Sequence, residues 1–273
     1  MSDVKNKSIQ ATLTVTRKTL VTPNYMRVFL TGDNMSQFVG PTVGVNNKIL
    51  IPPQGLNKIC FPSFDYGKME WIHPPEDVRP VIRTYTHRGI DLERNEIWID
   101  FALHGSSSPA SGWAIRAQTG DVLGVLMHNE KSVLYTPAEN YVLVADASGL
   151  PVIAAILEDL PPTAKGICLL EVNSVEDEQT LVTQADIRFT WLHNPTPQVG
   201  SELFYHLKKE KLPDISRFGY VAAEFSTVKH IRSFIRKELN WRREELYAYS
   251  YWKAGMSEDK STKDRHQEKE TRY

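Results

Sequence analysis

The chain has 273 residues, 41% of them hydrophobic, and its 32 basic and 33 acidic side chains leave a formal net charge of −1. This length supports two compact domains with separate cores, and the balanced charge excludes a global field that attracts nucleic acid or an acidic membrane surface. The most apolar stretch, residues 141–160, contains three acidic side chains and a proline, so we expect no membrane span. The polar N-terminus lacks the apolar core of a signal peptide, and we therefore expect a cytoplasmic protein.

The cysteines and histidines do not indicate a metal centre. Two cysteines, Cys60 and Cys168, are too few for a thiolate-ligated iron–sulfur cluster, which needs about four ligands. The eight histidines show no spacing typical of metal ligands. We expect no protein-bound metal, although a chelated metal can arrive inside a substrate.

The first half of the chain has the pattern of antiparallel strands. Short alternating or β-branched runs are separated by turn residues, and helical periodicity is nearly absent. Six strands are predicted, at residues 11–17, 26–31, 48–51, 81–87, 96–103 and 122–127. Six strands close a small β-barrel, which we place in residues 1–136, with residues 52–79 as an inserted loop that has room for a hairpin.

The pattern changes after residue 137, where continuous apolar runs alternate with helical segments. The predicted strands here are residues 141–145, 166–172, 188–192, 219–223 and 246–251. One predicted helix covers residues 151–160, and a second carries an apolar stripe from Val228 to Leu239. We therefore expect a doubly wound parallel sheet in residues 137–256, followed by a charged tail or exposed helix in residues 257–273.

A basic and aromatic segment ends the fourth predicted strand and reads Arg83-Thr84-Tyr85-Thr86-His87-Arg88. Alternation puts Arg83, Tyr85 and His87 on one face. Such a face offers a planar platform for a flavin ring and cations for a pyrophosphate. An edge strand with merely solvated arginines is an equal alternative on these six residues alone.

A loop of small residues follows the next predicted strand and reads His104-Gly105-Ser106-Ser107-Ser108-Pro109-Ala110-Ser111-Gly112-Trp113-Ala114. Its second half opens a predicted helix. Backbone amides at a helix N-terminus favour a phosphate, and small residues leave such amides accessible. A plain surface loop uses the same residues, so the pairing with the Arg/Tyr strand is what favours a ligand.

Four motifs together make the sequence similar to the siderophore-interacting protein family of flavin reductases, which are related to ferredoxin–NADP reductases. The motifs are Arg-x-Tyr-Thr-x-Arg at 83–88, His-Gly…Pro-Ala-Ser-x-Trp-Ala at 104–114, Ala-Asp…Leu-Pro at 145–151 and Tyr-Trp-Lys-x-Gly at 251–255. The resemblance covers nearly the whole chain. It implies an FAD-binding barrel, an NAD(P)H-binding-like α/β domain, and the reduction of Fe(III)-siderophores to release Fe(II).

The resemblance also implies site residues. The FAD contacts that it implies are Arg83, Thr84, Tyr85, Thr86, Arg88, His104, Ser108, Ala110, Ser111, Trp113 and Ala114. It implies a basic substrate site of Lys48, Lys131 and Lys253, and Asp146 as a residue that binds NAD(P)H. Each lysine taken alone is better explained as a solvated surface charge. NADH or NADPH is the expected electron donor, ferredoxin is an alternative, and we expect a monomer without an acid–base catalyst.

The chain departs from the family pattern at two turns. The turn at 146–151 reads Asp-Ala-Ser-Gly-Leu-Pro where an acidic pair and Thr are usual, and residues 128–131 lack the usual Gly-Pro. No Gly-x-Gly-x-x-Gly follows residues 141–145, so a nicotinamide dinucleotide is not held by that fingerprint. Two rival functions stay open: a ferredoxin or flavodoxin reductase without siderophore specificity, and a non-redox siderophore-binding protein.

Overall fold

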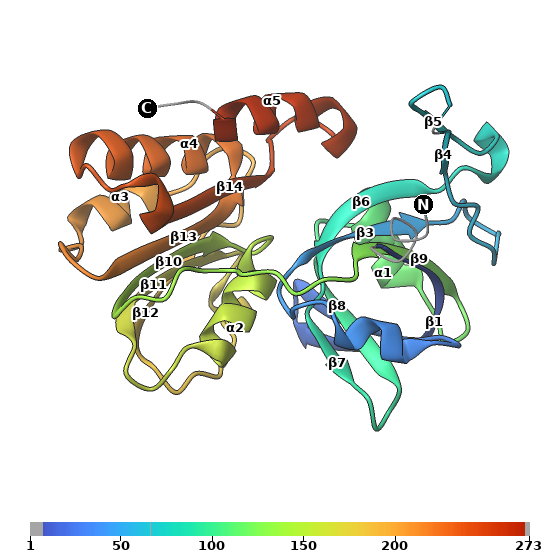
Figure 1. Ribbon diagram of the computed structural model, residues 1–273, viewed down its shortest axis with the longest axis horizontal. Helices are drawn as coiled ribbons and strands as arrows, with labels where there is room; N and C mark the ends of the chain where they lie inside the picture. The colour runs from blue at the N-terminus through green and yellow to red at the C-terminus, as the bar shows by residue number, and fades with distance from the viewer. Residues whose placement is uncertain (1–7, 66, 271–273) are drawn as a thin grey trace. The chain divides into compact units, whose positions relative to one another are not determined.

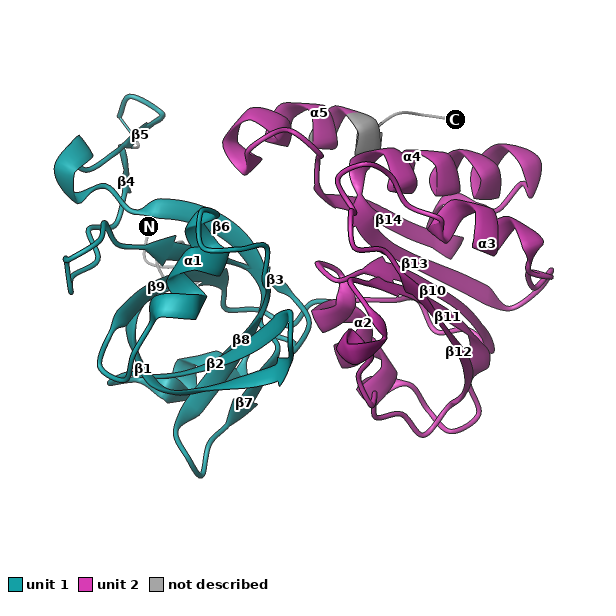
Figure 2. Cartoon of the chain, turned by 180° about the vertical axis from the view of Figure 1, so that it is seen from behind, with its two compact units in different colours: residues 1–132 teal, residues 133–273 magenta. Residues whose placement is uncertain are grey.

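The computed structural model describes residues 8–65 and 67–270, and it divides into two compact units between Ser132 and Val133. Figure 1 shows the elements in chain order and Figure 2 distinguishes the two units. Within the described residues, no helix is both long enough and apolar enough to cross a bilayer.

The first unit is built on a curled antiparallel sheet of seven strands in the order β6-β3-β9-β1-β2-β8-β7, plus the hairpin β4-β5. The strands are β1 (Ser8–Thr22), β2 (Tyr25–Thr31), β3 (Asn46–Ile51), β4 (Ser63–Asp65), β5 (Glu70–Ile72), β6 (Val81–Thr86), β7 (Gly89–Asp91), β8 (Glu96–Ala102) and β9 (Val122–His128). The sheet thus has one strand more than the six predicted. The additional strand, β7, is three residues long, too short for an alternating pattern to reveal.

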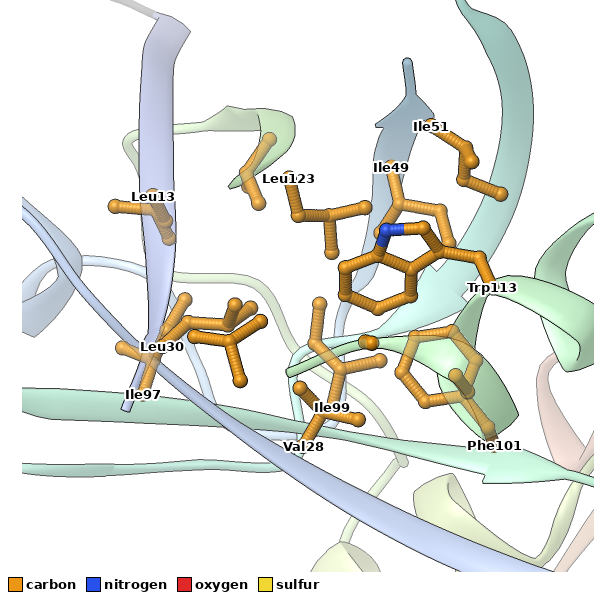
Figure 3. Packing of buried hydrophobic residues seen from close by; sticks show 14 of the residues in the cluster. Leu13, Val28, Leu30, Ile49, Ile51, Ile97, Ile99, Phe101, Trp113 and Leu123 are labelled. Carbon is orange, nitrogen blue, oxygen red and sulfur yellow. The ribbon is translucent and has the colours of Figure 1, made fainter. Parts of the chain in front are cut away.

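Apolar side chains from both ends of the curled sheet meet in one core (Figure 3). Leu13, Val28 and Leu30 are almost fully buried there, as are the alternate β8 residues Ile97, Ile99 and Phe101. Helix α1 (Pro109–Arg116) adds Trp113 to this core. Burying one large side chain of this kind stabilises the fold by about 1.5–3 kcal/mol, so this core fixes α1 relative to β8.

The second unit holds a parallel sheet of five strands in the order β12-β11-β10-β13-β14. The strands are β10 (Asn140–Asp146), β11 (Lys165–Val172), β12 (Asp186–His193), β13 (Arg217–Glu224) and β14 (Leu246–Trp252). The helices are α2 (Leu150–Asp159), α3 (Leu203–Lys209), α4 (Phe225–Ser233) with its π-helical extension η4 (Phe234–Glu238), and α5 (Glu258–Glu270). Helix α2 covers one face, while α3 and α4 cover the other (Figure 1). This is the predicted doubly wound sheet, and its strand order reverses between β10 and β13.

The charged C-terminal segment forms a helix, α5, that packs on β14. Arg265 is 4% exposed and donates to the backbone oxygens of Ser250 at 3.2 Å and Tyr251 at 2.7 Å. Ser261 is also fully buried. A few buried polar anchors therefore hold a helix whose composition alone indicates a solvated segment.

Candidate cofactor and substrate sites

Strand β6 presents its predicted cofactor residues on two faces. Thr84 lies opposite Lys48 in the antiparallel register with β3, and the Lys48 Nζ donates to Thr84 Oγ1 at 2.5 Å. Side chains alternate along a strand, so Arg83 and Tyr85 lie on the other face. Both are half-buried. The predicted division into two faces holds for residues 83–85, and it joins Thr84 to a predicted substrate lysine. His87, predicted on the face of Arg83 and Tyr85, lies beyond the end of β6 and is fully buried.

An aromatic row connects β6 to α1 through β8. The Tyr85 and Phe101 ring centroids are 4.6 Å apart, and those of Phe101 and Trp113 are 5.7 Å apart. Trp113 is 8% exposed, and its neighbours Ala110 and Ala114 are buried as well. The side chains of these three α1 residues therefore fill the core of the first unit and are not exposed on its surface.

The turn that leads into α1 is held by a hydroxyl. Ser111 is 1% exposed, and its Oγ accepts from the His104 N–H at 3.0 Å and donates to the Gly105 carbonyl at 2.8 Å. An added Cβ on Gly112 would lie 2.3 Å from the Ser106 oxygen, so the turn folds directly onto the helix. Ser111 thus shapes the loop that the sequence predicted to bind phosphate.

The start of α1 leaves its first amides without a side-chain acceptor. The N-cap residue Ser108 makes no side-chain cap hydrogen bond, Pro109 occupies the first turn, and this turn has no acidic residue. Unpaired amides and the helix dipole together favour an anion. With the arginines of the 83–88 segment and the half-buried Tyr85 ring, this start has the donors and the platform that an FAD diphosphate and ring require.

Arg88 lies in a buried ion cluster that sequence reasoning missed. Its side chain is 8% exposed, and its Nε lies 3.8 Å from Asp100 Oδ2. Arg27 donates to both Asp100 oxygens, at 2.7 and 2.8 Å. Burial, first, and the Asp100 charge, second, raise the pKa of the neighbouring Tyr25. Thr86 is buried close by in sequence. The available signal for this cluster was a carboxylate, Asp100, flanked by the apolar residues Ile99 and Phe101 in β8.

The three predicted substrate lysines lie on different elements. Lys48 is exposed on β3, and Lys131 is exposed after β9. Lys253 follows β14 in the second unit, where its Nζ lies 2.5 Å from Asp264 Oδ2 and 4.6 Å from the Phe225 ring centroid. The ion pair with α5 was not predicted, because nothing in the charged C-terminal pattern distinguishes Asp264 from its neighbours.

Asp146 ends β10 and binds the protein itself. Its Oδ1 accepts from Ser148, through the N–H at 2.9 Å and the hydroxyl at 2.5 Å, and from the Gly149 N–H at 3.4 Å. Its Oδ2 accepts from the Glu224 N–H at 2.8 Å and the Trp252 indole N–H at 2.7 Å. Burial raises the pKa of this carboxyl, and the donors oppose that shift. Asp146 therefore ties together the ends of β10, β13 and β14.

Two more carboxylates end neighbouring strands in the same way. Glu224 ends β13 and its Oε2 accepts from the Ser226 N–H at 2.5 Å and the Thr227 N–H at 3.4 Å at the start of α4. Glu171, near the end of β11, accepts from the Glu202 N–H at 3.2 Å. An acidic residue at the end of a predicted parallel strand was the available sequence signal for all three, whereas the role expected of Asp146 came from the family resemblance.

A curled antiparallel sheet followed by a parallel sheet of this order is the ferredoxin reductase-like fold. Family models narrow this fold to a class of FAD-binding proteins. Residues 14–130 match the siderophore-interacting FAD-binding domain, and residues 138–255 match the siderophore-interacting protein model.

Individual relatives agree with these matches. The chain is 33% identical to a ferric vibriobactin reductase, ViuB, of Vibrio cholerae over 97% of both chains. It is 28% identical to an NADPH-dependent ferric-chelate reductase of Escherichia coli, over 89% of this chain and 92% of that one. The crystal structure of the siderophore-interacting protein SipS from Aeromonas hydrophila superposes with a TM-score of 0.80, at 28% identity, over 96% of this chain and 98% of that one. The chain belongs to the siderophore-interacting protein family, and its first unit is the FAD-binding domain of that family.

Proposed function

We propose that this protein is a cytoplasmic ferric-siderophore reductase, which releases iron as Fe(II) by electron transfer from reduced FAD. The observation that carries the proposal is the uncapped, acid-free start of α1, linked to Tyr85 of β6 through Phe101. The likeness to a ferric vibriobactin reductase over 97% of the chain supports the same activity. In this role the protein works as a monomer.

The residues of β6 and α1 would hold the cofactor. Arg83 and Arg88 supply positive charge for the diphosphate, Tyr85 supplies a surface for the ring, and Ser111 keeps the 104–108 turn in place. The Asp100 and Arg27 cluster restrains the Arg88 side chain. When bound, FAD links a two-electron donor to Fe(III), which takes one electron at a time.

The lysines would supply charge for the substrate. Ferric siderophores with catecholate or hydroxamate groups carry hard oxygen ligands and are often anionic, so cations beside an open site raise their local concentration. Lys48, Lys131 and Lys253 are assigned this role. No side chain has to act as an acid–base catalyst. Fe(II) binds hard anionic oxygen ligands more weakly than Fe(III) does, and it therefore leaves the chelate after reduction.

Anaerobic iron release tests this function. Purified protein loaded with FAD is mixed with NADPH or NADH and a ferric siderophore, and Fe(II) is trapped by a coloured chelator. Fe(II) should appear only with protein, FAD and donor together. Reduced flavin that yields no Fe(II) from catecholate and hydroxamate chelates would point instead to a ferredoxin or flavodoxin reductase. A chain that binds siderophore but no flavin would be a binding protein, and either result overturns the proposal.

A further inference from the structure

We propose that the second unit excludes the pyrophosphate of a pyridine nucleotide from the carboxyl edge of its sheet, with Asp146 and Glu224 as the excluding residues. The electron donor is then recognised through its reduced nicotinamide ring. NADPH, NADH and reduced nicotinamide mononucleotide serve alike. This inference rests on the proposed reductase function, and it assigns Asp146 a role opposite to the nucleotide binding expected from the sequence.

The first step is the place where a dinucleotide would bind. In doubly wound sheets, ligands enter the crevice at the carboxyl ends of the strands where the strand order reverses, and a pyrophosphate lies on a helix N-terminus there. In this sheet the reversal is between β10 and β13. The helix starts beside it belong to α2, which follows β10, and α4, which follows β13.

The turn before α2 packs directly on β13. Gly149, at the turn between β10 and α2, lies so close to β13 that an added Cβ would be 2.1 Å from the Ala222 oxygen and 2.7 Å from the Ala222 Cβ. Real Cβ atoms are not found this close to other atoms. This packing fixes the turn on the neighbouring strand, so a phosphate at this edge would have to bind the amides of the turn itself.

The turn before α2 has already given its amides to a carboxylate. Asp146 accepts from the N–H groups of Ser148 and Gly149, and its second oxygen reaches across to the Glu224 N–H and the Trp252 indole. The donors that a pyrophosphate would need here are thus bound to an internal anion.

The start of α4 is occupied in the same manner. Glu224 accepts from Ser226 and Thr227 through one oxygen and from the Ala254 N–H at 3.2 Å through the other. A pyrophosphate at this edge would meet two buried carboxylates and compete for amides that they hold. The start of α1 in the first unit, by contrast, has the neutral Ser108 at its N-cap, and this side chain makes no cap hydrogen bond. Of these three helix starts, the one left for a phosphate is therefore that of α1, in the unit that is assigned the FAD.

Stopped-flow reduction of the FAD-loaded protein under anaerobic conditions tests the inference. The donors are NADPH, NADH and reduced nicotinamide mononucleotide, which lacks the adenosine monophosphate half. We expect second-order rate constants for flavin reduction within about 3-fold of one another, because the half that is absent would contribute little binding energy. ADP-ribose, tested by calorimetry on the same protein, should show no binding at millimolar concentration.

A dinucleotide that outperforms the mononucleotide by about 100-fold or more, with binding of ADP-ribose, overturns the inference. Failure of all three donors to reduce the flavin overturns it also, since the nicotinamide ring is then not recognised. The proposed function is tested separately by reducing the flavin with dithionite and removing the excess before ferric siderophore is added. Fe(II) release in that arm leaves the reductase function intact whatever the donors do.

The charges are tested by Glu224→Gln, which keeps an oxygen acceptor for the α4 amides, and by Asp146→Asn. The control is Glu139→Gln, an exposed carboxylate in the same unit. Removal of either buried charge should raise the rate ratio of dinucleotide to mononucleotide several-fold, and the control should not. Circular dichroism confirms that each variant is folded. A ratio that stays at the wild-type value in folded forms of both variants contradicts the assignment to these carboxylates.

Discussion

The helix starts of the two units form an instructive pair. Helices α1 and α2 both follow a strand and a turn of small residues, and both have proline in the first turn. At α1 the N-cap side chain of Ser108 accepts no hydrogen bond from the helix amides, whereas before α2 the turn amides donate to Asp146. A helix N-terminus after a strand is therefore not open to an anion by geometry alone. We expect the charge of the residue that ends the preceding strand, acidic Asp146 in β10 and neutral Ala102 in β8, to decide it.

The largest expected effect comes from removing the carboxylate that holds the turn amides before α2. Asp146→Ala leaves five donated hydrogen bonds without their acceptor, and we expect the free energy of unfolding to fall by about 3 kcal/mol. Burial raises the pKa of Asp146, so removing this carboxyl relieves the fold of a buried charge. The five donors left without an acceptor cost more than this relief returns. Urea titration measures the change, with exposed Asp186→Ala as control. A loss of similar size in both variants would remove the special role of Asp146.

The opposite change places a carboxylate at the N-cap of α1. Ser108→Asp should cap α1 and raise the thermal stability of the apoprotein by about 0.5–1 kcal/mol. It should also weaken FAD binding by about 100-fold, because a carboxylate then competes with and repels the diphosphate. The quenching of flavin fluorescence on titration of the apoprotein gives the affinity.

The control for this change is Ser108→Asn, which caps the helix without a charge and should leave FAD affinity nearly unchanged. Equal loss of FAD affinity in the Asp and Asn variants would mean that shape, not charge, governs the start of α1.

The comparison extends to buried titratable groups. Asp146 is surrounded by donors, whereas His87 in the first unit is fully buried and, among the described residues, neither ring nitrogen has a hydrogen-bond partner. Burial lowers the pKa of His87 to about 4 from an ordinary value of 6.5. The folded state then binds fewer protons than the unfolded state between these values, so stability is full above pH 6.5 and is lost as the pH falls toward 4.

Between pH 7 and pH 5, this histidine should cost about 2 kcal/mol of unfolding free energy. His87→Phe should flatten the pH dependence by that amount in urea titrations at the two pH values. His128→Phe changes an exposed histidine in the same unit and should leave the pH dependence as it is. An unaltered slope in the His87 variant would show that other groups carry the acid sensitivity.

The smallest expected effect concerns the ion pair of Lys253 and Asp264 in the second unit, where an acidic side chain occupies a lysine that is assigned to the substrate. Lys253 is paired with Asp264, whose side chain is 41% exposed, so an anionic chelate has to displace a partner worth roughly 0.5–1 kcal/mol. Asp264→Asn should therefore lower the apparent KM for an anionic ferric siderophore by about 2- to 5-fold. Asp259→Asn removes the same charge elsewhere on α5. If both variants change KM equally, net charge rather than the Lys253 pair is responsible.

Local patterns were enough to predict much of the fold and part of the candidate site. The alternation of residues 83–85 and the small-residue turn before α1 follow from neighbours in the chain, and the structure keeps both features, although the strand ends at Thr86, one residue short of His87. The uses of Asp146 and Arg265 did not follow, because the Asp146 bond to Trp252 spans 106 residues and the Arg265 bonds join a charged helix to backbone oxygens. Residue types show which groups can bind; only tertiary contacts show which are already bound.

The contact of Gly149 with Ala222 has a consequence for how this sheet can change. A hydrogen atom is the largest side chain that the turn accepts, and the obstacle on the far side is main chain, which no substitution removes. Any residue other than glycine at position 149 therefore has to push α2 away from β13, whereas the nearby acids can be neutralised without moving the two strands apart. The turn before α2 is thus fixed in its backbone and open to change only in its charge.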